Sequence, residues 1–65
     1  MTKQEAMKLK QGDKVWAKLS DGTLLLGKFF MVGEFNGKTR VVVSSSGLEG
    51  YPREYAFAPE LVMEA

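Results

Sequence analysis

Two dipeptides, Asp21-Gly22 and Asn36-Gly37, constrain the fold more than any other feature, because each interrupts a run of apolar and β-branched residues. Both positions of such a pair tolerate a positive φ, as the two-residue turn of a β-hairpin requires. The run before the first turn, residues 13–19, also alternates between two kinds of side chain, which is the period of a strand. The sequence therefore predicts two consecutive hairpins.

The first predicted strand has two unlike faces. One face carries Val15, Ala17 and Leu19, and the other carries Lys14, Trp16 and Lys18. The apolar face is expected to fill the interior, which turns Trp16 outward. An outward tryptophan is either an anchor for a binding partner, since tryptophan is enriched at binding hot spots, or a side chain packed under an N-terminal helix.

The second predicted strand, residues 23–35, is apolar on both faces. Strict alternation sorts its side chains into Leu24, Leu26, Phe30 and Val32 on one face, and Leu25, Phe29 and Met31 on the other. Gly27 inside the strand predicts a bend, of the kind that turns the corner of a small barrel. The face that does not fill the interior is too apolar to meet water alone. We expect the N-terminal segment to cover part of it, or self-association to bury it, and favour self-association.

Residues 2–10 are predicted to form a short helix, because Thr2 and Glu5 have the spacing of a capping box. Ala6 and Leu9 would lie against the body of the domain. Fewer than three turns are marginal without tertiary contacts, so a frayed leader is the alternative.

The rest of the chain predicts three further strands and one turn. Residues 38–45 form the third strand and 53–57 the fourth, with a loop from Ser44 that also holds Glu49. Residues 59–61 suit a single 3₁₀ turn before a last strand at 62–64. The expected organisation is a helix or arm over residues 1–11 and an all-β domain over 12–65.

The composition excludes several kinds of chemistry. The chain of 65 residues contains no cysteine and no histidine, which removes disulfides, thiol nucleophiles and the usual general base. We expect no enzyme activity, no cofactor and no metal. The three serines at 44–46 lack a base and read as a polar strand end. No apolar run approaches the roughly 20 residues that cross a bilayer, so we expect no membrane contact and a cytoplasmic location.

Charge is distributed unevenly along the chain. Residues 1–40 carry eight basic and four acidic side chains, a net +4, while residues 41–65 carry one basic and four acidic side chains, a net −3. A basic segment of this kind attracts polyanions, although folding also brings such segments together and neutralises them.

The order of these features resembles the SH3-like barrel, a five-stranded, partly open barrel. The resemblance rests on the Gly-Asp-Lys-Val run at 12–15, the two hairpin turns, the bend at Gly27, and the run from Tyr55 to Val62 that would hold the 3₁₀ turn. It implies an all-β fold over residues 12–64. Many unrelated functions share this fold, so the resemblance does not select one.

Three relatives within this group suggest different activities. Tudor-like modules share the Gly-Asp-x-Val-x-Ala pattern at 12–17 and bind methyl-lysine in an aromatic cage, to which Trp16 would contribute. Barrels similar to the ribosomal and transcription-factor KOW type bind RNA or protein through basic loops. The small-barrel dihydrofolate reductases resemble the chain in length and strand order, and Tyr55 matches the tyrosine of the Gln-Ile-Tyr triplet near their end. This similarity implies a tetramer with a pore for folate and NADPH.

We predict a non-catalytic interaction module, which binds another protein or a second copy of itself. The expected interface residues are Trp16, Leu24, Leu26 and Phe30. The alternative is a nucleic-acid-binding barrel that uses Lys14, Trp16, Lys18, Lys28 and Arg40. An oligomeric reductase is the remote third interpretation.

Overall fold

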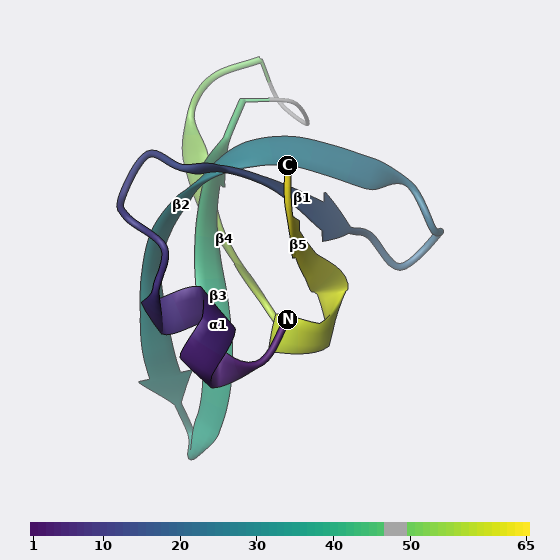
Figure 1. Ribbon diagram of the computed structural model, residues 1–65. Coiled ribbons are helices and arrows are strands. Elements are labelled where there is room, and N and C mark those ends of the chain that lie inside the picture. Colours follow the sequence, from purple (N-terminus) through teal and green to yellow (C-terminus); the bar gives the residue numbers. More distant parts are fainter. Residues whose placement is uncertain (47–49) are drawn as a thin grey trace.

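The computed structural model describes residues 1–46 and 50–65. The described chain forms one antiparallel sheet of five strands in the order β4-β3-β2-β1-β5 (Figure 1). Its elements are α1 (Lys3–Met7), β1 (Lys14–Lys18), β2 (Leu24–Phe35), β3 (Lys38–Ser45), β4 (Arg53–Phe57), the 3₁₀ turn η1 (Pro59–Leu61) and β5 (Val62–Glu64). The all-β class, the short N-terminal helix and the 3₁₀ turn before the last strand are confirmed. The sheet is open, with β4 and β5 as its edges, and the part of the predicted loop that holds Glu49 lies outside the described residues.

The two hairpin turns differ in length. Asn36 and Gly37 both have a positive φ, 53° and 76°, and connect β2 to β3 as a two-residue turn. The first turn has three residues, because the Leu19 amide donates to the Thr23 carbonyl and only Gly22 has a positive φ. A type I turn that ends in a left-handed glycine is the ordinary three-residue solution. The prediction of a two-residue turn was therefore wrong by one residue there.

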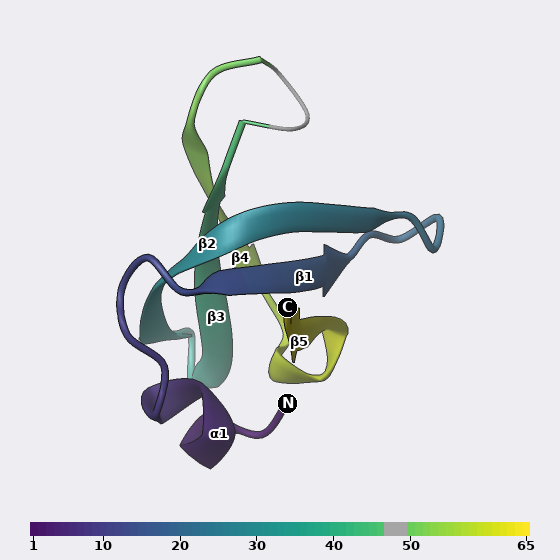
Figure 2. The ribbon, with the colours of Figure 1, turned by 45° about the horizontal axis from the view of Figure 1, so that its top comes forward.

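The long strand β2 bends at Gly27 and belongs to two layers. Its first half pairs with β1 and its second half with β3, and Figure 2 shows β1 lying across the direction of β3. A Cβ at Gly27 would lie 2.5 Å from Val43 Cγ1 and 2.8 Å from the Ser44 carbonyl oxygen. Glycine is thus required because β3 crosses directly against the backbone of β2. The Ser45 hydroxyl fastens this corner by donating to the Leu26 carbonyl at 2.8 Å.

A β-bulge at Phe30 changes which side chains of β2 face inward. Phe29 pairs with Val43 and Met31 with the next residue, Val42, which leaves Phe30 without a register partner. Because the bulge adds one residue to β2, the alternation shifts by one position beyond it. Val32 therefore packs against the core while Met31 is exposed. Strict alternation had assigned these two residues to the opposite faces, and that prediction was wrong.

Apart from Phe29, the core consists of small and medium side chains, and its members come from the helix and four strands. Its buried members are Ala6, Val15, Ala17, Phe29, Val41, Val43 and Val62. Ala6 comes from α1, which begins at the predicted capping box: Glu5 N donates to Thr2 Oγ1 and Thr2 N donates to Glu5 Oε1. The amino group of Met1 donates to the carbonyls of Pro59 and Val62 at 2.7 and 2.9 Å. The N-terminal segment is thus packed against the sheet, in agreement with the predicted helix.

Candidate functional site: an apolar and basic face of the sheet

The outward face of β1, the first half of β2, and β5 forms three rows of side chains, which we call the binding face. Register partners in neighbouring strands share a face of the sheet. The middle row is apolar, because Trp16 pairs with Leu26 on one side and with Met63 on the other. Its neighbours are a row of Lys14 paired with Lys28, and a row of Lys18 paired with Leu24. Alternate residues of a strand are about 7 Å apart, so lysine rows lie on both sides of the apolar row.

The apolar members of the binding face are accessible to solvent. Leu24 and Leu26 are each 47% exposed, Met63 is 45% exposed, and Trp16 is half-buried between its neighbours. Val15 and Ala17, the residues on either side of Trp16, are completely buried on the opposite face. The predicted outward direction of Trp16 is therefore correct.

The N-terminal helix does not cover this face. Ala6 of α1 is in the core cluster with Val15 and Ala17, and these residues lie on the side of β1 opposite to Trp16. The helix therefore packs on the interior side, beside the far half of β2, as Figure 1 shows. The alternative interpretation that placed α1 over Trp16 was wrong, and the helix leaves Leu24 and Leu26 exposed.

Met63 is the member of the binding face that the sequence analysis missed. Met63 lies beside Trp16 only because β5 pairs with β1, although the two residues are 47 positions apart in the sequence. The local signal was the 3₁₀ turn at Pro59–Leu61, which sets the start of the last strand. The local sequence of a three-residue strand does not indicate which other strand it will pair with.

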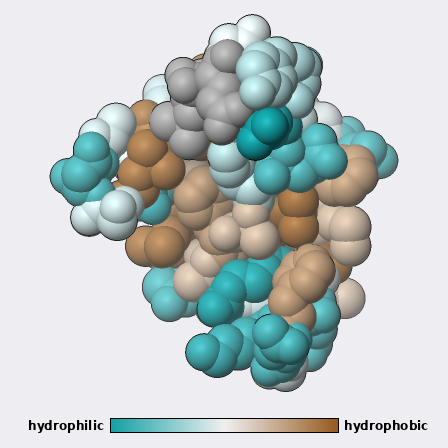
Figure 3. Space-filling model, turned by 180° about the vertical axis from the view of Figure 1, so that it is seen from behind, coloured by the Kyte–Doolittle hydropathy of each residue, from teal (hydrophilic) through white to brown (hydrophobic). Residues whose placement is uncertain are grey.

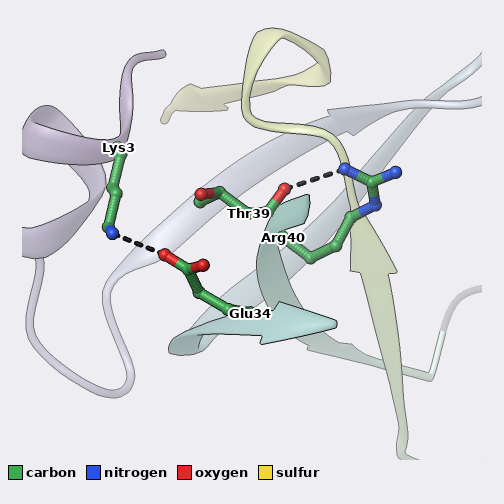
Figure 4. Close-up of polar contacts among 4 residues, drawn as sticks. All are labelled: Lys3, Glu34, Thr39 and Arg40. Carbon is green, nitrogen blue, oxygen red and sulfur yellow. Dashed lines mark hydrogen bonds and ion pairs between the residues drawn. The ribbon is translucent and has the colours of Figure 1, made fainter. Parts of the chain in front are cut away.

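The lysines of the binding face are free of ion pairs among the described residues. The salt bridge that the described chain makes is instead between Lys3 and Glu34, at 2.6 Å (Figure 4). That contact holds the pKa of the Glu34 carboxyl below its ordinary value, because the lysine donates a hydrogen bond to the carboxylate.

Two of the predicted site residues lie away from the binding face. Arg40 pairs with Gly33 near the far end of the β2–β3 hairpin, and its guanidinium donates to the Thr39 carbonyl at 2.8 Å (Figure 4). Phe30 lies at the bulge, beside Met31. The five predicted nucleic-acid residues are therefore not one surface: Lys14, Trp16, Lys18 and Lys28 are together, and Arg40 is separate.

Exposed apolar side chains also occur beyond the binding face. Phe30 is 38% exposed, Met31 44% and Phe35 49%, and the Phe35 ring lies over Gly33. On the face seen in Figure 3, hydrophobic residues gather across the middle, with hydrophilic residues at the rim. The sheet thus exposes apolar side chains on both sides of the corner at Gly27.

A hollow of about 380 Å³ adjoins the binding face at the corner of β2. It is lined by Lys14, Leu26, Gly27, Lys28, Ser44, Ser45, Ser46 and Pro52. Two of these residues are the paired lysines of the binding face, and three are the consecutive serines at the end of β3. From the sequence alone these serines indicate only a polar strand end, because their approach to Lys28 depends on the β2–β3 register.

Two other kinds of functional feature are absent from the described residues. Among them no group of three or more acidic side chains is placed to hold a metal ion, and no helix is long and apolar enough to span a membrane. Comparison of the chain with protein-family models, with curated proteins and with solved structures finds no match. Functional inference therefore rests on the binding face and the hollow.

Proposed function

We propose that this protein is a non-catalytic interaction module that docks a segment of a partner protein on the binding face. The observation that carries the proposal is the arrangement of the three rows, in which exposed Leu24, Leu26 and Met63 surround Trp16 between lysines that form no salt bridge with a described residue. We further propose that the open sheet is an SH3-like barrel. A cytoplasmic location fits a chain without cysteine.

Charge complementarity defines the partner segment. The lysines Lys14, Lys28 and Lys18 lie one row before and one row after the apolar row. An extended segment presents alternate side chains on one side with the same spacing of about 7 Å. The matching pattern is therefore acidic, apolar and acidic at every second residue, as in Glu-Thr-Leu-Thr-Glu.

A protein segment fits this face better than a nucleic acid does. Stacking of bases uses aromatic rings and arginine, whereas the exposed side chains around Trp16 are Leu24, Leu26 and Met63. Arg40, the arginine that the nucleic-acid interpretation needs, lies in the distant half of the hairpin. Aliphatic side chains are instead suited to excluding water beneath an apolar partner.

The fluorescence of Trp16, the single tryptophan, tests the proposal. A peptide with two copies of Glu-Thr-Leu-Thr-Glu should change the emission saturably, and should lose affinity when its leucines are replaced by serine or its glutamates by glutamine. In the protein, Leu26→Ser should weaken binding about tenfold, since a lost buried contact at a hot spot costs more than about 1 kcal/mol. Phe35→Ser, on the other side of the corner, is the matched control and should bind normally.

Two outcomes would overturn the proposal. One is an emission that does not respond to the peptide but responds saturably to an oligothymidylate, with affinity that falls steeply as salt rises; this result selects the nucleic-acid interpretation. The other is sedimentation as a stable dimer that Leu26→Ser dissociates, which would assign the binding face to a second copy of the chain.

A further inference from the structure

The hollow at the corner of β2 concentrates positive charge beside hydroxyl groups. Lys14 and Lys28 are direct register partners, and both line the hollow together with Ser44, Ser45 and Ser46. No acidic side chain is among the described residues that line it. From this arrangement we infer that the hollow binds the phosphoryl group of a phosphomonoester.

The two lysines need a counterion that the described residues do not supply. Like charges at directly opposed positions of two strands repel each other, and neither Lys14 nor Lys28 forms a salt bridge with a described residue. In the register, Glu54 pairs with Ser44 and so lies two strands from Lys28. Glu64 is closer to Lys14, but it pairs with Val15, whose buried side chain is on the opposite face of β1. A bound dianion would neutralise both ammonium groups and remove their repulsion.

The hydrogen-bonding groups also match a phosphoryl group. At neutral pH such a group carries about −1.5 to −2 charges and three acceptor oxygens, while each lysine ammonium brings three donors and each serine hydroxyl one. The Ser45 hydroxyl already donates to the Leu26 carbonyl. Ser44 and Ser46, on either side of it, supply hydroxyls with no such bond to another described residue.

The hollow has a size and position appropriate to such a ligand. Its volume of about 380 Å³ lies at the lower end of the range for small-molecule sites, and it leaves room for the atoms to which the phosphoryl group is attached. Gly27 brings the backbone of β2 close to the end of β3, which holds the lysines and the serines in one place. The site uses Lys14 and Lys28 of the binding face but requires neither Trp16 nor Leu24.

Titration of the isotopically labelled protein with inorganic phosphate and with O-phosphoserine, followed by amide chemical shifts at constant ionic strength, tests this inference. We expect both probes to cause saturable shifts at residues 26–28 and 44–46. Lys28→Gln should weaken binding about tenfold, as expected for the loss of one charge-assisted hydrogen bond, and Ser44→Ala should weaken it by a smaller factor. Lys18→Gln is the matched control, because Lys18 is on the same face but outside the hollow.

Three results would overturn the inference. Shifts that stay linear to the highest phosphate concentration would mean that no site exists. Equal weakening by Lys18→Gln and Lys28→Gln would mean diffuse attraction to the face, and dimethyl phosphate binding as tightly as phosphoserine would refute recognition of a dianion. Leu26 also lines the hollow, so the variant that should weaken only the docking of the peptide is Leu24→Ser, outside the hollow. Ser44→Ala and free phosphate address the hollow, so failure of one proposal is distinguishable from failure of the other.

Discussion

Replacement of Gly27 by alanine tests the corner that positions both the binding face and the hollow. The added Cβ would lie 2.5 Å from Val43 Cγ1, 2.8 Å from the Ser44 carbonyl oxygen and 3.2 Å from Ser45 Cβ. Val43 is completely buried and belongs to the core, and the Ser44 oxygen is backbone, so no side-chain rotation relieves the contact. The two strands must separate at this point.

The expected magnitude follows from overpacking, which costs about 1–3 kcal/mol when the neighbours cannot move freely. Replacement of glycine by alanine also restricts the unfolded chain, which by itself raises the free energy of unfolding by about 0.4–1 kcal/mol. The difference between the two terms is an expected decrease of about 1.5 kcal/mol in the free energy of unfolding of Gly27→Ala. In a chain of this length, that is a large part of a total stability of roughly 3–10 kcal/mol, and it lowers Tm by about 10 °C.

Gly33→Ala is the matched control, because Gly33 lies in the same strand. Its Cβ would meet Phe35 Cε2 at 2.8 Å, but Phe35 is 49% exposed and its ring can turn away into solvent. Urea unfolding followed by circular dichroism should place Gly33→Ala within about 0.5 kcal/mol of the original protein. Equal stability of the two variants, with Gly27→Ala undiminished, would refute the account of the corner.

Two further predictions concern stability. The Tyr55 hydroxyl is buried and has no hydrogen-bond partner among the described residues, so Tyr55→Phe should leave the urea midpoint unchanged or raise the free energy of unfolding by about 1 kcal/mol; a clear loss of stability would mean that the hydroxyl is satisfied. The pKa values of Glu5 and Glu34 are lowered from their ordinary 4.5, by hydrogen bonds from Thr2 and from Lys3 respectively. Groups with a lowered folded pKa stabilise the protein above the unfolded pKa and lose that contribution as the pH falls through the folded pKa. Tm should therefore decline below about pH 5, less steeply in Glu34→Gln, and an unchanged slope in that variant would contradict the assignment.

Local chemistry explains the features that the sequence analysis predicted correctly. The capping box of Thr2 and Glu5, the positions of the two turns, the length of the second turn and the bend at Gly27 each depend on residues close together in the chain. The outward direction of Trp16 followed from simple alternation with Val15 and Ala17. Such features are set by backbone preferences that neighbouring residues share.

Long-range contacts decided the features that the sequence analysis missed. The bulge at Phe30 reverses the faces of Met31 and Val32, and no local signal in β2 marked it. Met63 joined the binding face through the pairing of β5 with β1. The helix packs on the interior side and not over Trp16, because Ala6 is buried in the core with Val15 and Ala17.

The separation of Arg40 from the lysines has the same origin. The positions of basic residues in the sequence contain no information about strand register. In the structure, the two halves of β2 pair with different strands, β1 and β3, and their directions diverge at Gly27. The hollow depends on that register too, since Lys28 pairs with Ser44 on one side and Lys14 on the other. Site prediction from sequence was thus limited by strand pairing more than by residue chemistry.

The most direct test of the proposed function is a map of the amide chemical shifts of the labelled protein during titration with the acidic and apolar peptide. The account predicts saturable changes at residues 14–18, 24–28 and 62–64, the three segments that form the binding face. Changes concentrated instead around Met31 and Phe35, or an unchanged spectrum, would contradict it.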